Sequence, residues 1–195
     1  MTGNHTYAKM MLPAPIRVWR YRLWPMTVGH YALLCRLDSP LVEGNEIPLA
    51  GDLASALWVL KQDWPDAYRK LGQKDHVKFV SRIGKKFNKA PAFHIAVLNE
   101  FYKYWAWQNA VYDIWKKEED GSPVDKSMSW LQTIRWILMN QWGYSSDEIN
   151  NLPYKLAVND CFGAMVANGN LEFVSDKQKA RREFIMQQME SKDAN

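Results

Sequence analysis

The sequence predicts an all-α fold, a compact domain of about seven or eight helices that follows a short extended N-terminal arm. Apolar residues recur at three- and four-residue spacing along most of the 195-residue chain, which is typical of amphipathic helices. Helix-capping residues and Gly or Pro stops separate these stretches. Hydrophobic residues make up 47% of the chain, which is enough for one sizeable core.

Three regions are expected along the chain. Residues 1–26 form the arm, because a polar stretch leads into Leu12-Pro13-Ala14-Pro15 and proline disfavours helix at the preceding residue. Within the arm, the alternation at 16–24 fits a short strand or an extended segment, and we favour the extended segment. Residues 27–170 form the helical domain, and 171–195 form a C-terminal helix with a mobile tail.

The first half of the helical domain contains five expected elements. These are helices at 27–37 and 52–61, a turn or short helix at 66–71, and helices at 73–89 and 91 to about 118. Thr27 and Asp52 are candidate N-caps for the first two helices. Asp38-Ser39-Pro40 and Trp64-Pro65 end them. Pro91 suits the first turn of the longest helix.

The second half of the domain is also expected to be helical. Ser127 opens a helix that Gly143 ends, since glycine is favoured just past a helix C-terminus. The sequence at 145–148 matches the Ser-x-x-Glu capping box, and the helix that it starts must bend or restart at Pro153. A final helix is expected from Asp176.

Composition limits the class of protein. The net charge of +4 permits an anionic partner but does not require one. The first dozen residues contain no apolar run like a signal peptide, and no stretch approaches the roughly 20 apolar residues of a membrane span. We therefore expect a soluble protein of a reducing cytoplasm. There Cys35 and Cys161 are expected as buried reduced thiols, with a disulfide as the alternative.

The sequence predicts neither an enzyme nor a metal or cofactor site. Zinc-ligand spacing, a phosphate-binding glycine loop and a nucleophile elbow are all missing from the sequence. His30 can serve as a base or stabilise its helix, and we favour the structural role because no partner for a base is evident. Glu100 and Asp113 are separated by roughly 20 Å on one helix and cannot form a single site. The turn at 142–149 resembles a DNA-reading motif, but the next helix has few basic residues, which favours packing.

The amphipathic helix at 73–89 has a basic side. That side can contact phosphates of nucleic acid or an acidic protein, or it can simply be solvated, which is the interpretation we favour. Nucleic-acid binding remains the alternative function. The residues of this candidate face for an anionic partner are Lys74, Lys78, Arg82, Lys85 and Lys89.

Aromatic residues are the most informative feature of the chain, which contains ten tryptophans. In the longest predicted helix, Trp105 and Trp107 point about 200° apart. Such a helix is either central to the core or keeps one aromatic side for a partner. The candidate partner-binding residues are Trp105, Trp107, Tyr112 and Trp115.

Two segments carry a family resemblance. Residues 22–42, with a Thr-x-Gly-His helix start and a Ser-Pro end, and residues 142–153, with Gly-x-Ser-x-x-Glu-x-x-x-x-Pro, resemble bacteriophage tail assembly chaperones. Together they cover about a sixth of the chain. The resemblance implies a helical, non-enzymatic protein of the host cytoplasm that binds structural clients such as the tape measure or tail tube protein. No catalytic residues carry over from it.

Overall fold

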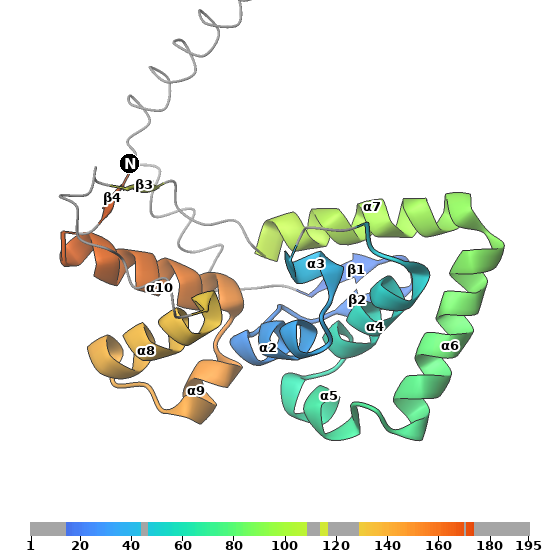
Figure 1. Cartoon of the computed structure of the whole chain (residues 1–195), viewed down its shortest axis with the longest axis horizontal. Coiled ribbons are helices and arrows are strands. Elements are labelled where there is room, and N and C mark those ends of the chain that lie inside the picture. Colours follow the sequence, from blue (N-terminus) through green and yellow to red (C-terminus); the bar gives the residue numbers. More distant parts are fainter. Residues whose placement is uncertain (1–14, 44–46, 109–113, 117–128, 170, 174–195) are drawn as a thin grey trace, which may run out of the picture.

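Helices account for most of the computed structural model, which describes residues 15–43, 47–108, 114–116, 129–169 and 171–173 (Figure 1). This confirms the expected all-α fold. Nine helices lie within the described residues: α2 (Val28–Arg36), α3 (Pro40–Glu43), α4 (Ala50–Leu60), α5 (Trp64–Lys70), α6 (Lys74–Lys89), α7 (Pro91–Gln108), α8 (Trp130–Trp142), α9 (Ser146–Asn151) and α10 (Tyr154–Ala167). The helix expected from Asp176 lies outside them.

Within the described residues, four short strands form two small antiparallel sheets. Strands β1 (Ile16–Val18) and β2 (Tyr21–Leu23) pair as a hairpin, and β3 (Ile114–Lys116) pairs with β4 (Leu171–Phe173). The segment at 16–24 is therefore two strands rather than one extended run. Its turn contains Trp19 in the left-handed region at φ 52°, where a non-glycine residue is uncommon. The sequence lacks the Asn-Gly or Asp-Gly signal that usually marks such a turn.

Helix caps in the structure follow the sequence closely but not everywhere. Thr27, Asp63 and Ser145 cap α2, α5 and α9, and Gly143 ends α8 at φ 70°. Helix α4 starts before its expected cap, because Asp52 lies in its first turn and accepts a hydrogen bond from the Leu49 N–H at 2.7 Å.

Helix α8 begins at Trp130 and is capped by Ser129, later than expected, and Ser127 itself lies outside the described residues. The Ser129 hydroxyl accepts from the Gln132 N–H at 3.3 Å, and the Gln132 side-chain oxygen accepts from the Ser129 N–H at 2.8 Å. This reciprocal pair satisfies two backbone donors. Ser127 could not form the same reciprocal pair, because the residue three positions later is Trp130, whose side chain has no hydrogen-bond acceptor.

The helices form two groups that meet at α2. In Figure 1, α8, α9 and α10 lie together on the left, while α7 runs along the top and α6 along the right-hand edge. Helix α4 packs along α6, and α2 contacts α4 and α5 on one side and α9 and α10 on the other. The buried apolar residues of both groups form one continuous cluster. None of the described helices is long and apolar enough to span a membrane.

Residues 24–28, here called the junction segment, link these groups through their backbone. The Trp24 N–H donates to the Leu60 carbonyl at 2.8 Å, and the Trp24 carbonyl accepts from the Tyr104 hydroxyl at 2.7 Å. The Met26 N–H donates to the side-chain oxygen of Gln108 at 3.0 Å. The ends of α4 and α7 are thereby tied to the chain just before α2.

The same segment also contacts the start of α10. The Met26 carbonyl accepts from the Tyr154 N–H at 2.7 Å, and the Val28 N–H donates to the Leu152 carbonyl at 3.0 Å. Met26 and Val28 are fully buried, where an unpaired backbone group is costly. Partners that are distant in sequence therefore satisfy the buried backbone of the junction segment.

Candidate protein-binding surface

The predicted aromatic helix is shorter in the structure than the sequence suggests. Helix α7 ends at Gln108, and residues 114–116 form strand β3 (Ile114–Lys116). The prediction of one helix that continues to about Glu118 is therefore wrong at residues 114–116. Pairing of β3 with β4 supplies the backbone partners that a longer helix would have provided. Trp115 is on this strand, and Tyr112 lies outside the described residues. Among the described residues, the predicted partner-binding residues on α7 are Trp105 and Trp107.

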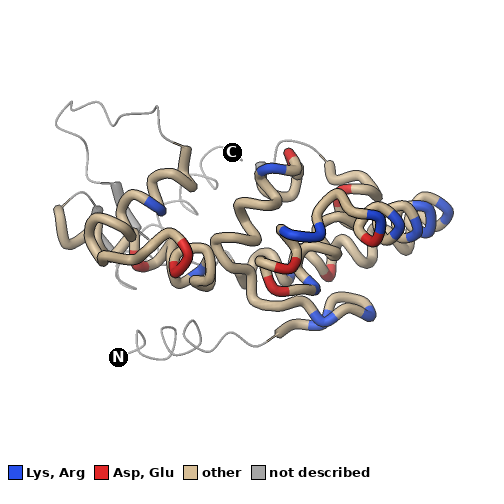
Figure 2. The backbone as a smooth tube through the Cα atoms, turned by 90° about the horizontal axis from the view of Figure 1, so that it is seen from below, with Lys and Arg blue, Asp and Glu red and all other residues tan. Residues whose placement is uncertain are grey.

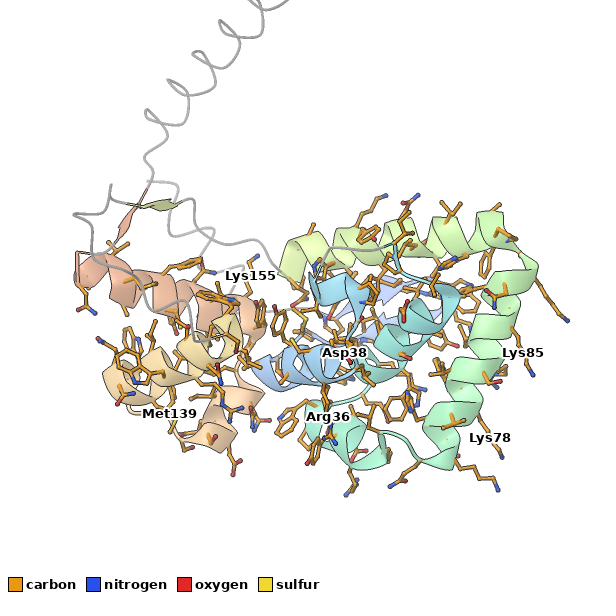
Figure 3. The ribbon with its side chains drawn as sticks, viewed as in Figure 1. Arg36, Asp38, Lys78, Lys85, Met139 and Lys155 are labelled. Carbon is orange, nitrogen blue, oxygen red and sulfur yellow. The ribbon has the colours of Figure 1, made fainter. Side chains whose placement is uncertain are left out.

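Trp105 and Trp107 are both half-buried. The Trp105 ring stacks on Phe101 with ring centroids 6.1 Å apart. Lys155 lies at the start of α10 (Figure 3), and its ammonium is 5.3 Å from the centroid of the Trp107 ring. The fully buried side of α7 passes between them through Phe101 and Tyr104. Each tryptophan therefore packs on the body with one part of its ring and shows the rest to solvent.

A more exposed apolar surface lies on α8. Trp136, Met139 and Trp142 are 55%, 48% and 55% exposed, and we call these three residues the α8 stripe. Within a straight helix they occupy an arc of about 120°. Figure 3 shows Met139 at the outer side of α8. The opposite side of the helix, with Ile134 and Leu138, is completely buried.

Sequence reasoning missed this stripe, although a signal was present. Trp136 follows Ile134 by two residues and so points about 200° away from the inner side of the helix. Trp142 follows the buried Leu138 by four residues, but it is the last helical residue, and at Gly143 the chain turns away through the left-handed region. When a helix has apolar residues on both sides but packs on the body with only one side, the apolar residues of the other side stay exposed.

The start of α8 is bonded to α10, and α8 itself carries a single charge. The Trp130 indole N–H donates to the Tyr154 hydroxyl at 3.1 Å, and the Tyr154 ring stacks on Tyr31 at 4.2 Å. Arg135 is the one charged residue of α8, and its guanidinium donates to the Ser146 hydroxyl. A well-held helix that presents two tryptophans and a methionine suits an apolar partner.

The basic side predicted for 73–89 is confirmed as one side of α6. Phe79, Ile83 and Phe87 are buried on the inner side, while all five predicted cations are exposed. Figure 2 shows basic residues concentrated at the end of the molecule that α6 forms. Within the described residues, the ion pairs join Asp66 to Arg69 and Lys70 and leave the α6 cations without an acidic partner.

His30 has a structural position. It is buried, its Nδ1 accepts from the Thr27 N–H at 3.2 Å, and its Nε2–H donates to the Gln62 carbonyl at 2.9 Å. Burial lowers the pKa of His30 to about 4, while the Gln62 hydrogen bond and the Asp63 charge oppose this shift. The imidazole is therefore neutral at pH 7 and completes the cap of α2.

Other candidate chemical groups do not form a reactive centre in the described part of the chain. No group of His, Cys, Asp and Glu there has the arrangement of a metal site. No disulfide joins Cys35 to Cys161, and burial raises the pKa of the Cys161 thiol to about 12. The carboxylate of Glu100 accepts a hydrogen bond from the Trp19 N–H, and Asp113 lies outside the described residues.

No protein-family model, curated protein or solved structure matches the chain.

Proposed function

We propose that the protein is a non-enzymatic phage or prophage assembly protein of the tail assembly chaperone type, acting in the host cytoplasm. Its client would be a helical segment of a structural protein such as the tape measure or tail tube protein. The observation that carries this proposal is the α8 stripe, an exposed apolar row on a helix whose other side is buried. Apolar stripes of this kind bind apolar sides of partner helices. Trp105 and Trp107 are a second predicted contact.

The stripe is large enough to dominate such an interaction. A tryptophan side chain buries about 150–250 Å² when it is fully enclosed, and Trp136 and Trp142 each keep about half of their surface in solvent. At about 25 cal/mol per Å², covering each ring contributes roughly 2–3 kcal/mol. Loss of one such contact weakens binding by about 30-fold or more.

Co-purification tests this proposal. The chain is co-expressed with a phage tape measure protein and, separately, with a tail tube protein, and Trp136→Ser/Trp142→Ser is compared with the wild type. We expect the double variant to lose the client and to keep its melting temperature, because both rings point to solvent. Capture of the client by the double variant at the wild-type level would refute the proposed surface.

A matched control distinguishes the stripe from apolar exposure in general. Ile95 on α7 is 57% exposed, so Ile95→Ser removes a similar solvent-facing group far from α8 in sequence. We expect this variant to capture the client as the wild type does. Equal loss in both variants would mean that the interaction is not specific to α8.

Nucleic-acid binding is the second candidate function, and the exposed cations of α6 favour it. Phosphate contacts by Lys78 and Arg82 would give an affinity for duplex DNA that falls steeply with salt. We expect Lys78→Glu/Arg82→Glu to reduce the slope of log affinity against log salt by about 2, as measured by fluorescence anisotropy. Arg22→Glu/Lys103→Glu changes the charge equally at exposed positions outside α6. If Lys78→Glu/Arg82→Glu binds duplex DNA with the wild-type affinity and salt dependence, this candidate function is excluded.

A further inference from the structure

A pocket of about 540 Å³ is lined by residues of α4, α5 and α6 and of their ends. These helices lie on the right in Figure 1, and α8 lies on the left. Its apolar wall includes Trp58 and Phe79, which are only 2% and 6% exposed. The polar residues that line it are Lys61, Gln62, Lys70, Asp75, Lys78 and Arg82. Three separate helices or helix ends therefore contribute positive side chains to one concave surface.

Positive charge in this pocket exceeds negative charge. Four cations line it against the single carboxylate of Asp75. Lys70 has an acidic partner, since its ammonium lies 2.6 Å from Asp66. The described residues provide no such ion pair for Lys61, Lys78 or Arg82. The pocket therefore has an uncompensated positive potential before any ligand enters.

Two of the cations converge on the same aromatic ring. The Lys61 ammonium lies 4.0 Å from the centroid of the Phe79 ring, and the Arg82 guanidinium carbon lies 5.9 Å from that centroid. Cation–π contacts hold such groups near a ring without neutralising their charge. The pKa of Lys61 is lowered, first by burial and then by the charges of Arg82 and Lys70. An anion between these groups would relieve their mutual repulsion.

We propose that this pocket binds a phosphate group. A phosphate monoester carries about −1.5 to −2 charge at pH 7 and three strong acceptor oxygens, so it can satisfy cations that approach from several helices. A carboxylate has one charge and a planar pair of oxygens, and it neutralises less of the pocket. The phosphate belongs either to a small phosphorylated ligand or to a nucleic-acid backbone. This proposal is independent of client binding at α8.

Calorimetric titration with inorganic pyrophosphate tests the site, at constant ionic strength set with chloride. We expect saturable binding to the wild type and, in Lys61→Gln/Arg82→Gln, affinity weaker by at least roughly tenfold, since each lost charged hydrogen bond is worth about 1.5 kcal/mol or more. Lys85→Gln/Lys89→Gln removes the same charge from α6 outside the pocket. This control should bind pyrophosphate within about twofold of the wild type. Absence of binding, or equal loss in both double variants, overturns the proposal.

Two further titrations identify the source of the phosphate and its chemistry. If the affinity for duplex DNA also falls more in Lys61→Gln/Arg82→Gln than in Lys85→Gln/Lys89→Gln, the site binds phosphates of a nucleic-acid backbone. If pyrophosphate alone shows this dependence, the ligand is a small phosphorylated molecule. Hexaglutamate binding at least as tightly as pyrophosphate would overturn the assignment to phosphate. Melting temperatures without ligand should stay close to the wild-type value in both double variants, because removal of like charges does not expose the core.

Discussion

Replacing Gly29 with alanine is expected to destabilise the protein by about 3 kcal/mol, at the upper end of the range for overpacking a core. Gly29 is the second residue of α2, where this helix approaches α5 and α9. A Cβ atom at this position would lie 2.5 Å from Cδ2 of Trp64 and 2.9 Å from the carbonyl oxygen of Asn150. Both distances are far below van der Waals contact.

Neither neighbour of Gly29 can move easily. The Trp64 indole N–H donates to the side-chain oxygen of Asn151 at 2.9 Å, which fixes the ring on α9. The carbonyl of Asn150 belongs to the backbone of that same helix. Relief of the clash therefore requires α2 to move away from α5 and α9. For a protein of this size, we expect the melting temperature to fall by on the order of 10 °C.

Gly163→Ala is the matched control for this prediction. Gly163 lies within α10, and a Cβ built there would meet nothing within 4 Å. Alanine in a helix interior is more stable than glycine by about 0.5–1 kcal/mol, so this variant should be slightly stabilised. Urea unfolding at pH 7 measures both changes. Similar stabilities of the two variants would show that α2 does not approach Trp64 this closely.

Acidification is expected to destabilise the protein through His30. In the unfolded chain a histidine has a pKa near 6.5, whereas burial lowers the pKa of His30 to about 4 in the folded state. Between these values the unfolded state binds the proton and the folded state does not. Stability is therefore complete above about pH 6.5 and falls as the pH decreases toward 4. The loss should be about 2 kcal/mol at pH 5 and on the order of 3 kcal/mol near pH 4.

Urea unfolding of the wild type and of His30→Gln at pH 7 and pH 5 measures this effect. The variant should be less stable at pH 7, since it loses a bond to Thr27 or to the Gln62 carbonyl, and its stability should change little between the two pH values. His76→Gln is the control, because burial also lowers the pKa of His76, but that side chain is only partly buried. A pH dependence that persists in His30→Gln and disappears in His76→Gln would contradict this assignment.

Local sequence signals predicted the helices well where one side of the helix is apolar and the other charged. Helix α6 is the clearest case, with buried Phe79, Ile83 and Phe87 opposite exposed cations. The stops and caps at Thr27, Gly143 and 145–148 were also correct, because their hydrogen bonds involve neighbouring residues only. Such features depend little on the rest of the fold.

Features that depend on distant residues were harder to predict. Strand β3 is extended because β4, far along the chain, pairs with it. The hairpin of β1 and β2 has a turn at Trp19, whose N–H donates to Glu100 on α7. The pocket between α4 and α6 brings Lys61 beside Arg82, and no local pattern connects these two residues. The α8 stripe was missed for another reason, since only packing decides which apolar side of a helix faces outward.

The junction segment has a consequence for the order of events during synthesis. Met26 and Val28 leave the ribosome long before residues 152–154, to which their buried backbone groups bond. Contacts of such long sequence separation form slowly because a large loop must close first. We therefore expect the nascent chain to remain incompletely folded, with the apolar side of α2 accessible to other chains, until α10 has been translated. Fragments that end before Leu152 should accumulate as aggregates rather than as a stable smaller domain.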